Sequence, residues 1–363
     1  MSDLKLSIAT GPYDRIAALR YGEIKPENIT LDYHAQVPVH GIFVEMAERE
    51  AWDASEMSLA LYITKRARMF NGGEEFPFVA IPVFPSRVFR HGNIFINKNT
   101  GIKTPKDLEG KRIGIQEYRQ SAGIWVRGIL RDEFKVDTET IQWVEGGVNE
   151  PRAPTSSDIR PNQAVDIVPL HKSNTLSEAL VEGEIDAIIA ARQPTCLHDC
   201  KDMGRLISNY REEERVFFNK TGIFPIMHTL VIREAIWKKH PWVSSSLFCA
   251  FEASKAKAAE MMAYSGAMVY MTPWLYDDLE EMNSVFGGDP WPYGLEANRQ
   301  HLGTFLRYLV EEGFLPEKPK LEKWINIGYF YFKYEILELI HEYERFDNFL
   351  KDISNKGMLN AYK

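Results

Sequence analysis

Cysteine is scarce in this sequence, and long apolar runs are missing from it. Three cysteines in 363 residues cannot build the disulfide framework that stabilises small secreted domains. No apolar stretch approaches the roughly 20 residues that a membrane-spanning helix needs. The first residues also lack the basic and apolar regions of a secretory leader. We therefore expect a soluble cytoplasmic protein without a membrane partner.

A surplus of positive charge is missing as well. The formal net charge is −8, whereas a surface that binds nucleic acid needs clustered Lys and Arg, so we expect no nucleic-acid partner. The sequence contains no Gly-rich phosphate loop for a nucleotide and no Gly-x-Ser-x-Gly elbow for a serine hydrolase. Cys196, His198 and Cys200 lack the second Cys/His cluster that would complete a structural zinc site.

The pattern of apolar residues predicts strands and helices that alternate along most of the chain. Ser58 and Thr175 are placed to cap helices, and Gly183 is placed to end one. Pro77, Pro82 and Pro85 are expected to interrupt one apolar strand. Strands are expected near residues 4–9, 29–33, 52–55, 78–84, 112–115, 185–191 and 224–232, and later helices near 242–264, 275–286, 294–312 and 330–352.

This alternation, in a chain too long for one ordinary core, predicts an α/β fold with two lobes. Each lobe is expected to be a mainly parallel sheet flanked by helices, with a ligand cleft between the lobes and extra helices at the C-terminus. Residues 1–95 and 226–330 are assigned to a discontinuous first lobe, residues 96–225 to an inserted second lobe, and residues 331–363 to a C-terminal helical extension. The chain is expected to cross between lobes near Asn93 and Pro225.

Polar side chains follow the predicted strands at the edge where α/β sheets bind their ligands. Helix N-termini at that edge favour anions, and the fork of an arginine matches a carboxylate. A small organic acid is therefore the expected ligand. The candidate residues are Tyr13, Glu56, Ser58, Arg87, Arg90, His91, Tyr118, Ser121, Arg127, Arg192 and His228.

Each candidate also has an ordinary structural explanation. Arg87, Arg90 and Arg127 are alternatively partners in ion pairs with nearby carboxylates. His228 lies on an apolar strand, where a hydrogen-bonded core histidine is the usual case, and Glu56 would favour the positive end of the helix that follows it. The position of Arg87 and Arg90 in an otherwise apolar stretch favours a ligand role.

Four segments resemble the 4,5-dihydroxyphthalate decarboxylase family in order and spacing. They are residues 55–58 (SEMS), 78–91 (FVAIPVFPSRVFRH), 125–130 (WVRGIL) and 221–229 (TGIFPIMHT), and the resemblance covers about residues 4–330. It implies a type II periplasmic-binding-protein-like fold used as a cytoplasmic enzyme of phthalate degradation. The implied reaction converts 4,5-dihydroxyphthalate to protocatechuate without an organic cofactor. The chain departs from the family pattern in the loop 146–163 and in a longer tail from about Phe332.

The resemblance suggests a division of roles. Arg87 and Arg90 are expected to hold the carboxylate that stays, and His91 or His228 to exchange the proton. Glu56 is expected near the leaving carboxylate or a hydroxyl. Substrate contacts are expected from Tyr13, Ser58, Tyr118, Ser121, Arg127 and Arg192.

Three alternatives stay open at this point. A divalent metal held by Glu56 and a histidine is an alternative to the expected reaction without a cofactor. The chain is alternatively a non-catalytic solute-binding protein for a small aromatic or organic acid, in transport or sensing, since the same fold serves both purposes. The aromatic run at 329–332 is consistent with a homo-oligomer.

Overall fold

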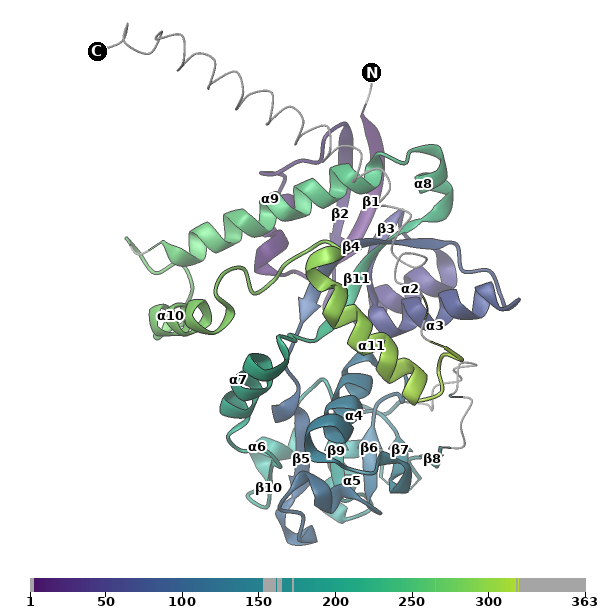
Figure 1. The fold of residues 1–363 in the computed structure, drawn as a ribbon, viewed down its shortest axis with the longest axis vertical. Helices are drawn as coiled ribbons and strands as arrows, with labels where there is room; N and C mark the ends of the chain where they lie inside the picture. Colours follow the sequence, from purple (N-terminus) through teal and green to yellow (C-terminus); the bar gives the residue numbers. More distant parts are fainter. Residues whose placement is uncertain are drawn as a thin grey trace, which may run out of the picture.

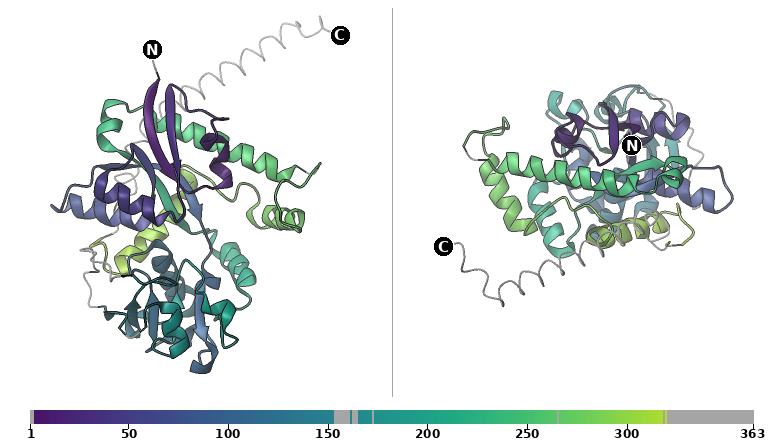
Figure 2. Two further views of the ribbon diagram at one scale, coloured as in Figure 1. Left: turned by 180° about the vertical axis from the view of Figure 1, so that it is seen from behind. Right: turned by 90° about the horizontal axis from the view of Figure 1, so that it is seen from above.

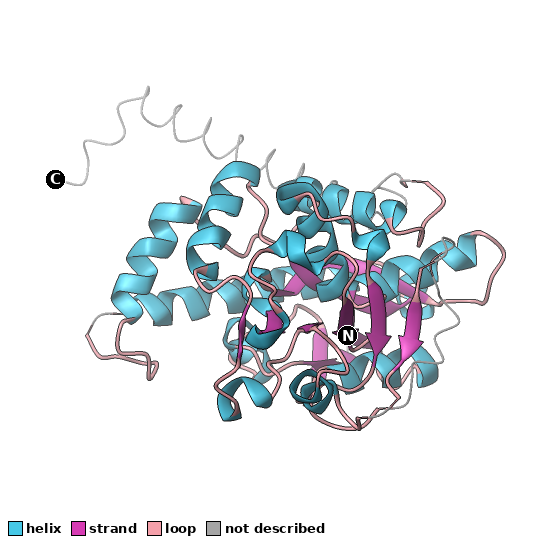
Figure 3. Ribbon diagram, turned by 90° about the horizontal axis from the view of Figure 1, so that it is seen from below, coloured by secondary structure: helices cyan, strands magenta, loops and turns pink. Residues whose placement is uncertain are grey.

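Two sheets, one above the other, form the centre of the molecule (Figure 1). A computed structural model describes residues 3–152, 161, 165–171, 173–264, 266–317 and 319. The first sheet has the strand order β2-β1-β3-β11-β4, and the second has the order β10-β5-β9-β6-β7-β8. Helices enclose the strands (Figure 3). The two-lobed α/β class predicted from the sequence is confirmed.

The first sheet combines strands from the start of the chain with one strand that returns much later. Its members are β1 (Leu4–Thr10), β2 (Ile29–Ala35), β3 (Ala54–Ser58), β4 (Phe78–Arg87) and β11 (Ile226–Arg233). β1 pairs in parallel with β2 and β3. β11 enters antiparallel between β3 and β4, so the sheet is mixed rather than mainly parallel.

Helices cover both faces of the first sheet (Figures 1 and 2). The long helix α9 packs along η1, α1 and β4, whereas α2 and α3 pack on β3. The helical segments are η1 (Asp14–Ile16), α1 (Ala17–Arg20), α2 (His40–Arg49), α3 (Leu59–Phe70), α8 (Glu234–Lys239), α9 (Val243–Ala263) and α10 (Leu275–Phe286).

The second sheet also combines parallel and antiparallel pairs of strands. β6 pairs in parallel with β7 and β9, and β7 with β8, while β5 runs antiparallel to both β9 and β10. The strands are β5 (Ile94–Asn97), β6 (Arg112–Ile115), β7 (Gln142–Glu145), β8 (Ile167–Pro169), β9 (Ala187–Ile189) and β10 (Met203–Arg205). The helical segments are η2 (His91–Asn93), η3 (Lys98–Thr100), η4 (Pro105–Leu108), α4 (Ser121–Phe134), η5 (Thr138–Thr140), α5 (Leu176–Glu182), α6 (Cys196–Asp199) and α7 (Tyr210–Thr221).

The predicted helix ends are confirmed where a side chain or a glycine defines them. Ser58 accepts a hydrogen bond from the Leu61 N–H at 3.4 Å, and Thr175 accepts one from the Glu178 N–H at 3.1 Å. Gly183 ends α5 with a φ of 75°, a backbone conformation that glycine adopts without strain.

The expected interruption of the strand at 78–84 is wrong. β4 runs unbroken from Phe78 to Arg87 although it contains Pro82 and Pro85. Its pairing with β11 shifts register on either side of His228, and such irregularities leave residues outside the ladder. Proline, which has no N–H to donate, is tolerated there.

The two sheets share one apolar core, which contains Ile8 and Leu230 of the first sheet and Ile113 of the second. α11 (Arg299–Glu311), preceded by η6 (Glu296–Asn298), packs on α4. Thus a helix that the sequence assigned to the first lobe contacts the second. The predicted extension at 331–363 lies outside the described residues. Among the described helices, none is long and apolar enough to cross a membrane.

We expect Gly128→Ala to destabilise the protein, because a Cβ at this position of α4 would overlap the ring of Tyr308 on α11. Forcing extra volume into a packed contact costs about 1–3 kcal/mol. Chemical denaturation measures the loss. Gly288→Ala is the matched control, since nothing lies within 4 Å of its added Cβ, and it should stay within about 0.5 kcal/mol of the parent. Equal stability of the two variants would contradict the packing of α11 on α4.

Candidate active site

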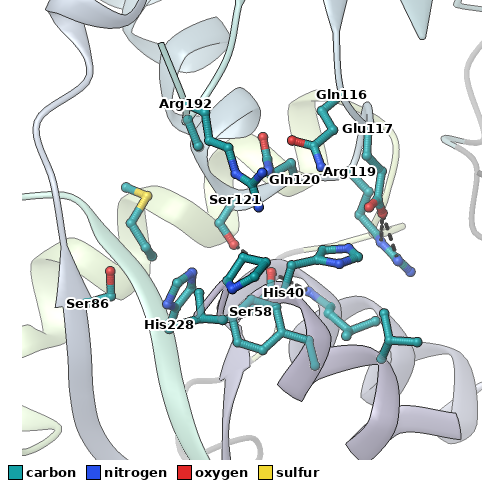
Figure 4. Close-up of a pocket in the computed structure, with 18 of the residues that line it drawn as sticks. His40, Ser58, Ser86, Gln116, Glu117, Arg119, Gln120, Ser121, Arg192 and His228 are labelled. Carbon is teal, nitrogen blue, oxygen red and sulfur yellow. Dashed lines mark hydrogen bonds and ion pairs between the residues drawn. The ribbon is translucent and has the colours of Figure 1, made fainter. Parts of the chain in front are cut away.

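A cavity of about 710 Å³ lies between the two sheets, where three helices begin (Figure 4). α2 begins with His40, α3 follows Ser58, and α4 begins with Ser121. The dipole of a helix is positive at its N-terminus and favours negative charge there. Three such ends at one cavity favour a ligand with negative charge.

A buried carboxylate and an imidazole form the polar centre of this site. His228 Nδ1 lies 2.5 Å from Glu56 Oε1, and the Glu56 side chain is 0% exposed. In the pairing of β11 with β3, His228 lies opposite Ser58, two residues beyond Glu56. Side chains two residues apart share one face of a strand, so the register brings His228 and Glu56 together diagonally.

Further donors fix the Glu56 carboxylate. The Gly11 N–H donates to Oε2 at 2.8 Å, and the Tyr13 hydroxyl donates to Oε1 at 2.7 Å. Burial by itself would raise the pKa of Glu56, but the hydrogen bonds from His228, Gly11 and Tyr13 outweigh it and hold the pKa below its usual range. The carboxylate is therefore ionised.

His228 presents its ring to the cavity (Figure 4). Nδ1 is engaged by Glu56, so Nε2 is the nitrogen available to a ligand. Burial and the charge of Glu56 raise the pKa of Tyr13, which stays protonated. The edge of the Phe43 ring packs against His228 at a centroid distance of 4.8 Å. The arrangement suits an acid–base group held in one orientation.

Arg90 is the buried cation of the cavity wall. It is 8% exposed, and burial lowers its pKa to about 10, so it stays charged at neutral pH. Its Nη1 donates to the Ala191 carbonyl at 3.4 Å, and its Nε has no hydrogen-bond partner within the described chain. Arg192, the next residue along, also lines the cavity, and neither arginine forms an ion pair with any described carboxylate.

Two other arginines of the cavity share a carboxylate. Arg119 binds Glu117 Oε1 through two nitrogens at 3.1 and 2.9 Å, and Arg152 lies 3.7 Å from Glu117 Oε2. Glu117 therefore offsets part of their charge. Arg90 and Arg192 are the better partners for the carboxylate of a ligand.

Ser58 and Ser121 join the two halves of the molecule at the cavity. Their hydroxyls lie 2.9 Å apart, and the Ala60 N–H donates to the Ser121 hydroxyl at 3.0 Å. This contact holds the start of α3 against the start of α4, one helix from each half. These hydrogen bonds thus join the two halves of the molecule at one wall of the cavity.

Six of the residues singled out from the sequence line this cavity, and a seventh lies directly behind it. The lining residues are Tyr13, Ser58, Arg90, Ser121, Arg192 and His228. Glu56 lies behind them, bound to both His228 and Tyr13.

Arg87 does not line the cavity. The prediction that it holds the carboxylate of the ligand is therefore wrong. Its guanidinium donates to the carbonyls of Phe224 at 3.1 Å and Pro292 at 2.9 Å and to the Asn298 amide oxygen. Burial lowers its pKa to about 9. These bonds tie β4 to the chain before β11 and to the segment before α11, so the side chain has a structural role.

His91, Tyr118 and Arg127 are also placed away from the cavity. His91 is a buried histidine whose pKa burial lowers to about 4, so its ring is neutral. Arg127 lies six residues after Ser121 on α4, about 240° around the helix, and binds Glu312 on the opposite side from the cavity. Tyr118 stacks beneath the Arg127 guanidinium at 3.8 Å.

Several residues of the cavity wall were not predicted from the sequence. His40 follows β2 and begins α2, so the rule that selected residues after strands would also have selected it. Arg152 lies in a loop that carries no regular pattern. Residues not proposed from the sequence that line the cavity include His40, Phe43, Lys65, Gln116, Arg119 and Arg152. Within the described residues, no group of three or more His, Cys, Asp or Glu side chains is placed to hold a metal ion.

Comparison with known proteins gives clear relatives in sequence. The chain is 35% identical over 318 residues to a 4,5-dihydroxyphthalate decarboxylase of Comamonas testosteroni, covering 86% of this chain and 93% of that protein. It is 36% identical over 196 residues to one of Pseudomonas putida, covering 54% of this chain and 74% of that protein. No protein-family model matches the chain.

Solved structures match the chain at low sequence identity and with TM-scores below 0.5. A periplasmic sulfonate-binding protein of Methylobacillus flagellatus KT is 15% identical with a TM-score of 0.48, over 89% of this chain and 91% of that chain. The desulfurization enzyme DSZB is 11% identical with a TM-score of 0.42, over 88% of this chain and 95% of that chain.

We expect Arg87→Ala to lower the free energy of unfolding by about 2–4 kcal/mol, because it leaves buried oxygens without a charged donor. Arg192→Ala, which removes an exposed side chain, should change it by less than about 0.5 kcal/mol. Chemical denaturation of the two variants beside the parent makes the comparison. If Arg87→Ala unfolds at the same denaturant concentration as the parent, the structural role of Arg87 is wrong.

Proposed function

The chain belongs to the 4,5-dihydroxyphthalate decarboxylase family, and we propose that it converts 4,5-dihydroxyphthalate to protocatechuate and CO2 in the cavity between its sheets. The substrate is a small dianion with an aromatic ring. The cavity matches that chemistry, with two cations that no described carboxylate pairs, three helix N-termini and the ring of Phe43. The observation that carries the proposal is the ionised Glu56 that orients His228 toward this cavity.

The reaction needs a route that avoids an aryl carbanion. The hydroxyl para to the leaving carboxylate gives up its proton, and its electrons flow into the ring. The carbon that bears the carboxylate then takes a proton and becomes tetrahedral. The bond to the carboxylate breaks, its electron pair restores the aromatic ring, and CO2 leaves. Proton donors, proton acceptors and cations supply everything these steps require, so we propose that no organic cofactor takes part.

His228 is the group that protonates the ring carbon. Glu56 holds Nδ1 at 2.5 Å, which leaves the proton on Nε2 directed into the cavity. The imidazolium loses this proton to carbon, and the charge that remains on Glu56 favours its return from solvent. The Tyr13 and Gly11 hydrogen bonds keep Glu56 from rotating away.

Arg90 and Arg192 hold the carboxylate that stays on the ring. A strong contact to the leaving carboxylate would weaken as CO2 becomes neutral, so it would stabilise the substrate more than the transition state. A contact to the retained carboxylate keeps its strength throughout the reaction and positions the ring. Closure through Ser58 and Ser121 removes water and strengthens both charge interactions.

The test of function is incubation of the purified protein with 4,5-dihydroxyphthalate, with CO2 and protocatechuate as the readouts. In D2O the product should carry one deuterium at the carbon that lost its carboxylate. Binding measured by calorimetry without turnover would instead favour a non-catalytic solute-binding protein. Neither binding nor turnover would contradict the assignment of this substrate.

We expect His228→Asn to lower kcat by about 10²–10⁴-fold, the usual contribution of a positioned acid or base. Substrate binding should persist, because Arg90 and Arg192 are unchanged. Steady-state kinetics and calorimetry measure the two effects separately. A variant that keeps more than half of the parental kcat would exclude His228 as the proton donor.

Loss of a cation should act mainly on substrate positioning. We expect Arg192→Ala to lower kcat/KM by about 10- to 100-fold, since a charge-assisted hydrogen bond is lost. Arg49→Ala is the control, because Arg49 lies on the surface of α2 and pairs with Glu45 one turn away. Equal kcat/KM values for both variants would remove Arg192 from the binding site.

A further inference from the structure

His40 is a second imidazole in the same cavity, and the acid–base scheme above does not use it. It is the first residue of α2 and lines the cavity with His228. Figure 4 shows the two rings at the cavity on the side of the first sheet, across from Gln116, Glu117 and Arg192 of the second half. Its ring accepts and donates no hydrogen bond within the described chain, so a ligand can use it.

Both imidazoles pack against one phenyl ring. The Phe43 centroid lies 4.8 Å from that of His228 and 6.4 Å from that of His40, at interplanar angles of 70° and 61°. Phe43 is buried and fixes the positions of both rings. A planar aromatic substrate held in this cavity can therefore meet an imidazole at two separate points on its rim.

The charges around the two imidazoles differ. His228 contacts a buried, ionised carboxylate. Burial lowers the pKa of His40, the positive charges of Arg152 and Arg192 lower it further, and only Glu117 opposes them. Other charged groups that line the same cavity are Glu48, Lys65, Arg90 and Arg119. The surroundings of His40 thus favour the neutral imidazole, which can take a proton, whereas His228 is oriented by its hydrogen bond to Glu56.

We propose that His40 accepts the proton of the substrate hydroxyl para to the leaving carboxylate, an assignment that rests on the proposed function. The O–H bond breaks, a ring nitrogen of His40 takes the proton, and the oxygen electrons enter the ring. His228 forms the new C–H bond, and the pair from the broken bond to CO2 restores aromaticity. His40 then returns its proton to the phenolate, so the net reaction consumes one proton, which solvent gives back to His228.

The test compares His40→Asn, and His40→Gln as a second variant, with the parent across pH. At pH 7 kcat should fall by about 100-fold, while protocatechuate still binds. As the pH rises, solvent removes the proton of the substrate hydroxyl, so the variants need the base less. The ratio of parental to variant kcat should therefore fall by about tenfold per pH unit. This ratio cancels the titration of His228, which all three proteins retain. His34→Asn is the control, since His34 lies exposed on β2 away from the cavity, and its ratio should stay near one.

Two results would overturn the assignment. If either variant keeps the parental kcat at pH 7, or if both lose activity by a factor that does not change with pH, His40 is not the base. Those results require an active parent, so they leave the proposed function intact. If the parent itself releases no CO2 from 4,5-dihydroxyphthalate, the proposed function fails, and the role of His40 fails with it.

Discussion

The buried Glu56 carboxylate is the constraint on which the site depends. An ionised group without solvent contact persists only when hydrogen bonds replace its hydration. Gly11, Tyr13 and His228 supply those bonds from the loop after β1 and from β11. Each of these partners is therefore held in place by the requirement to satisfy one charge. The same requirement makes the register of β11 against β3 matter for function, since a slip of one residue would turn His228 to the other face.

The cavity exists because the chain leaves the first sheet after β4 and returns to it at β11. The return strand brings His228 to a sheet whose other strands come from the first quarter of the chain. The excursion between them builds the second sheet and delivers Ser121 and Arg192 to the opposite wall. Trp125 of α4 donates to the Ile226 carbonyl at 2.8 Å, which anchors the second half directly at the start of β11. The polar groups that line the cavity thus come from segments far apart in the chain.

The arginines of the cavity differ in whether a carboxylate offsets their charge. Arg119 and Arg152 share Glu117, whereas Arg90 and Arg192 have no described carboxylate partner. Arg87, close in sequence to Arg90, points the other way and binds main-chain oxygens. The guanidiniums of Arg87 and Arg90 are both buried, but only Arg90 lines the cavity, so only its donors are placed to bind a ligand. The same contrast separates His91, a neutral core histidine, from His228.

The sequence by itself determined the two-lobed α/β class, the helix caps at Ser58 and Thr175 and the resemblance to a family. These follow from local periodicity, from turn and cap chemistry, and from segments read in order along the chain. Glu56, Ser58 and His228 could be found from the rule that ligands bind at strand ends. Arg87, His91, Tyr118 and Arg127 satisfied the same rule and lie elsewhere. Only tertiary structure decides which way a side chain points and what it touches, because strand register, the crossing of α11 onto α4 and the burial of each charge depend on contacts between residues far apart in the chain.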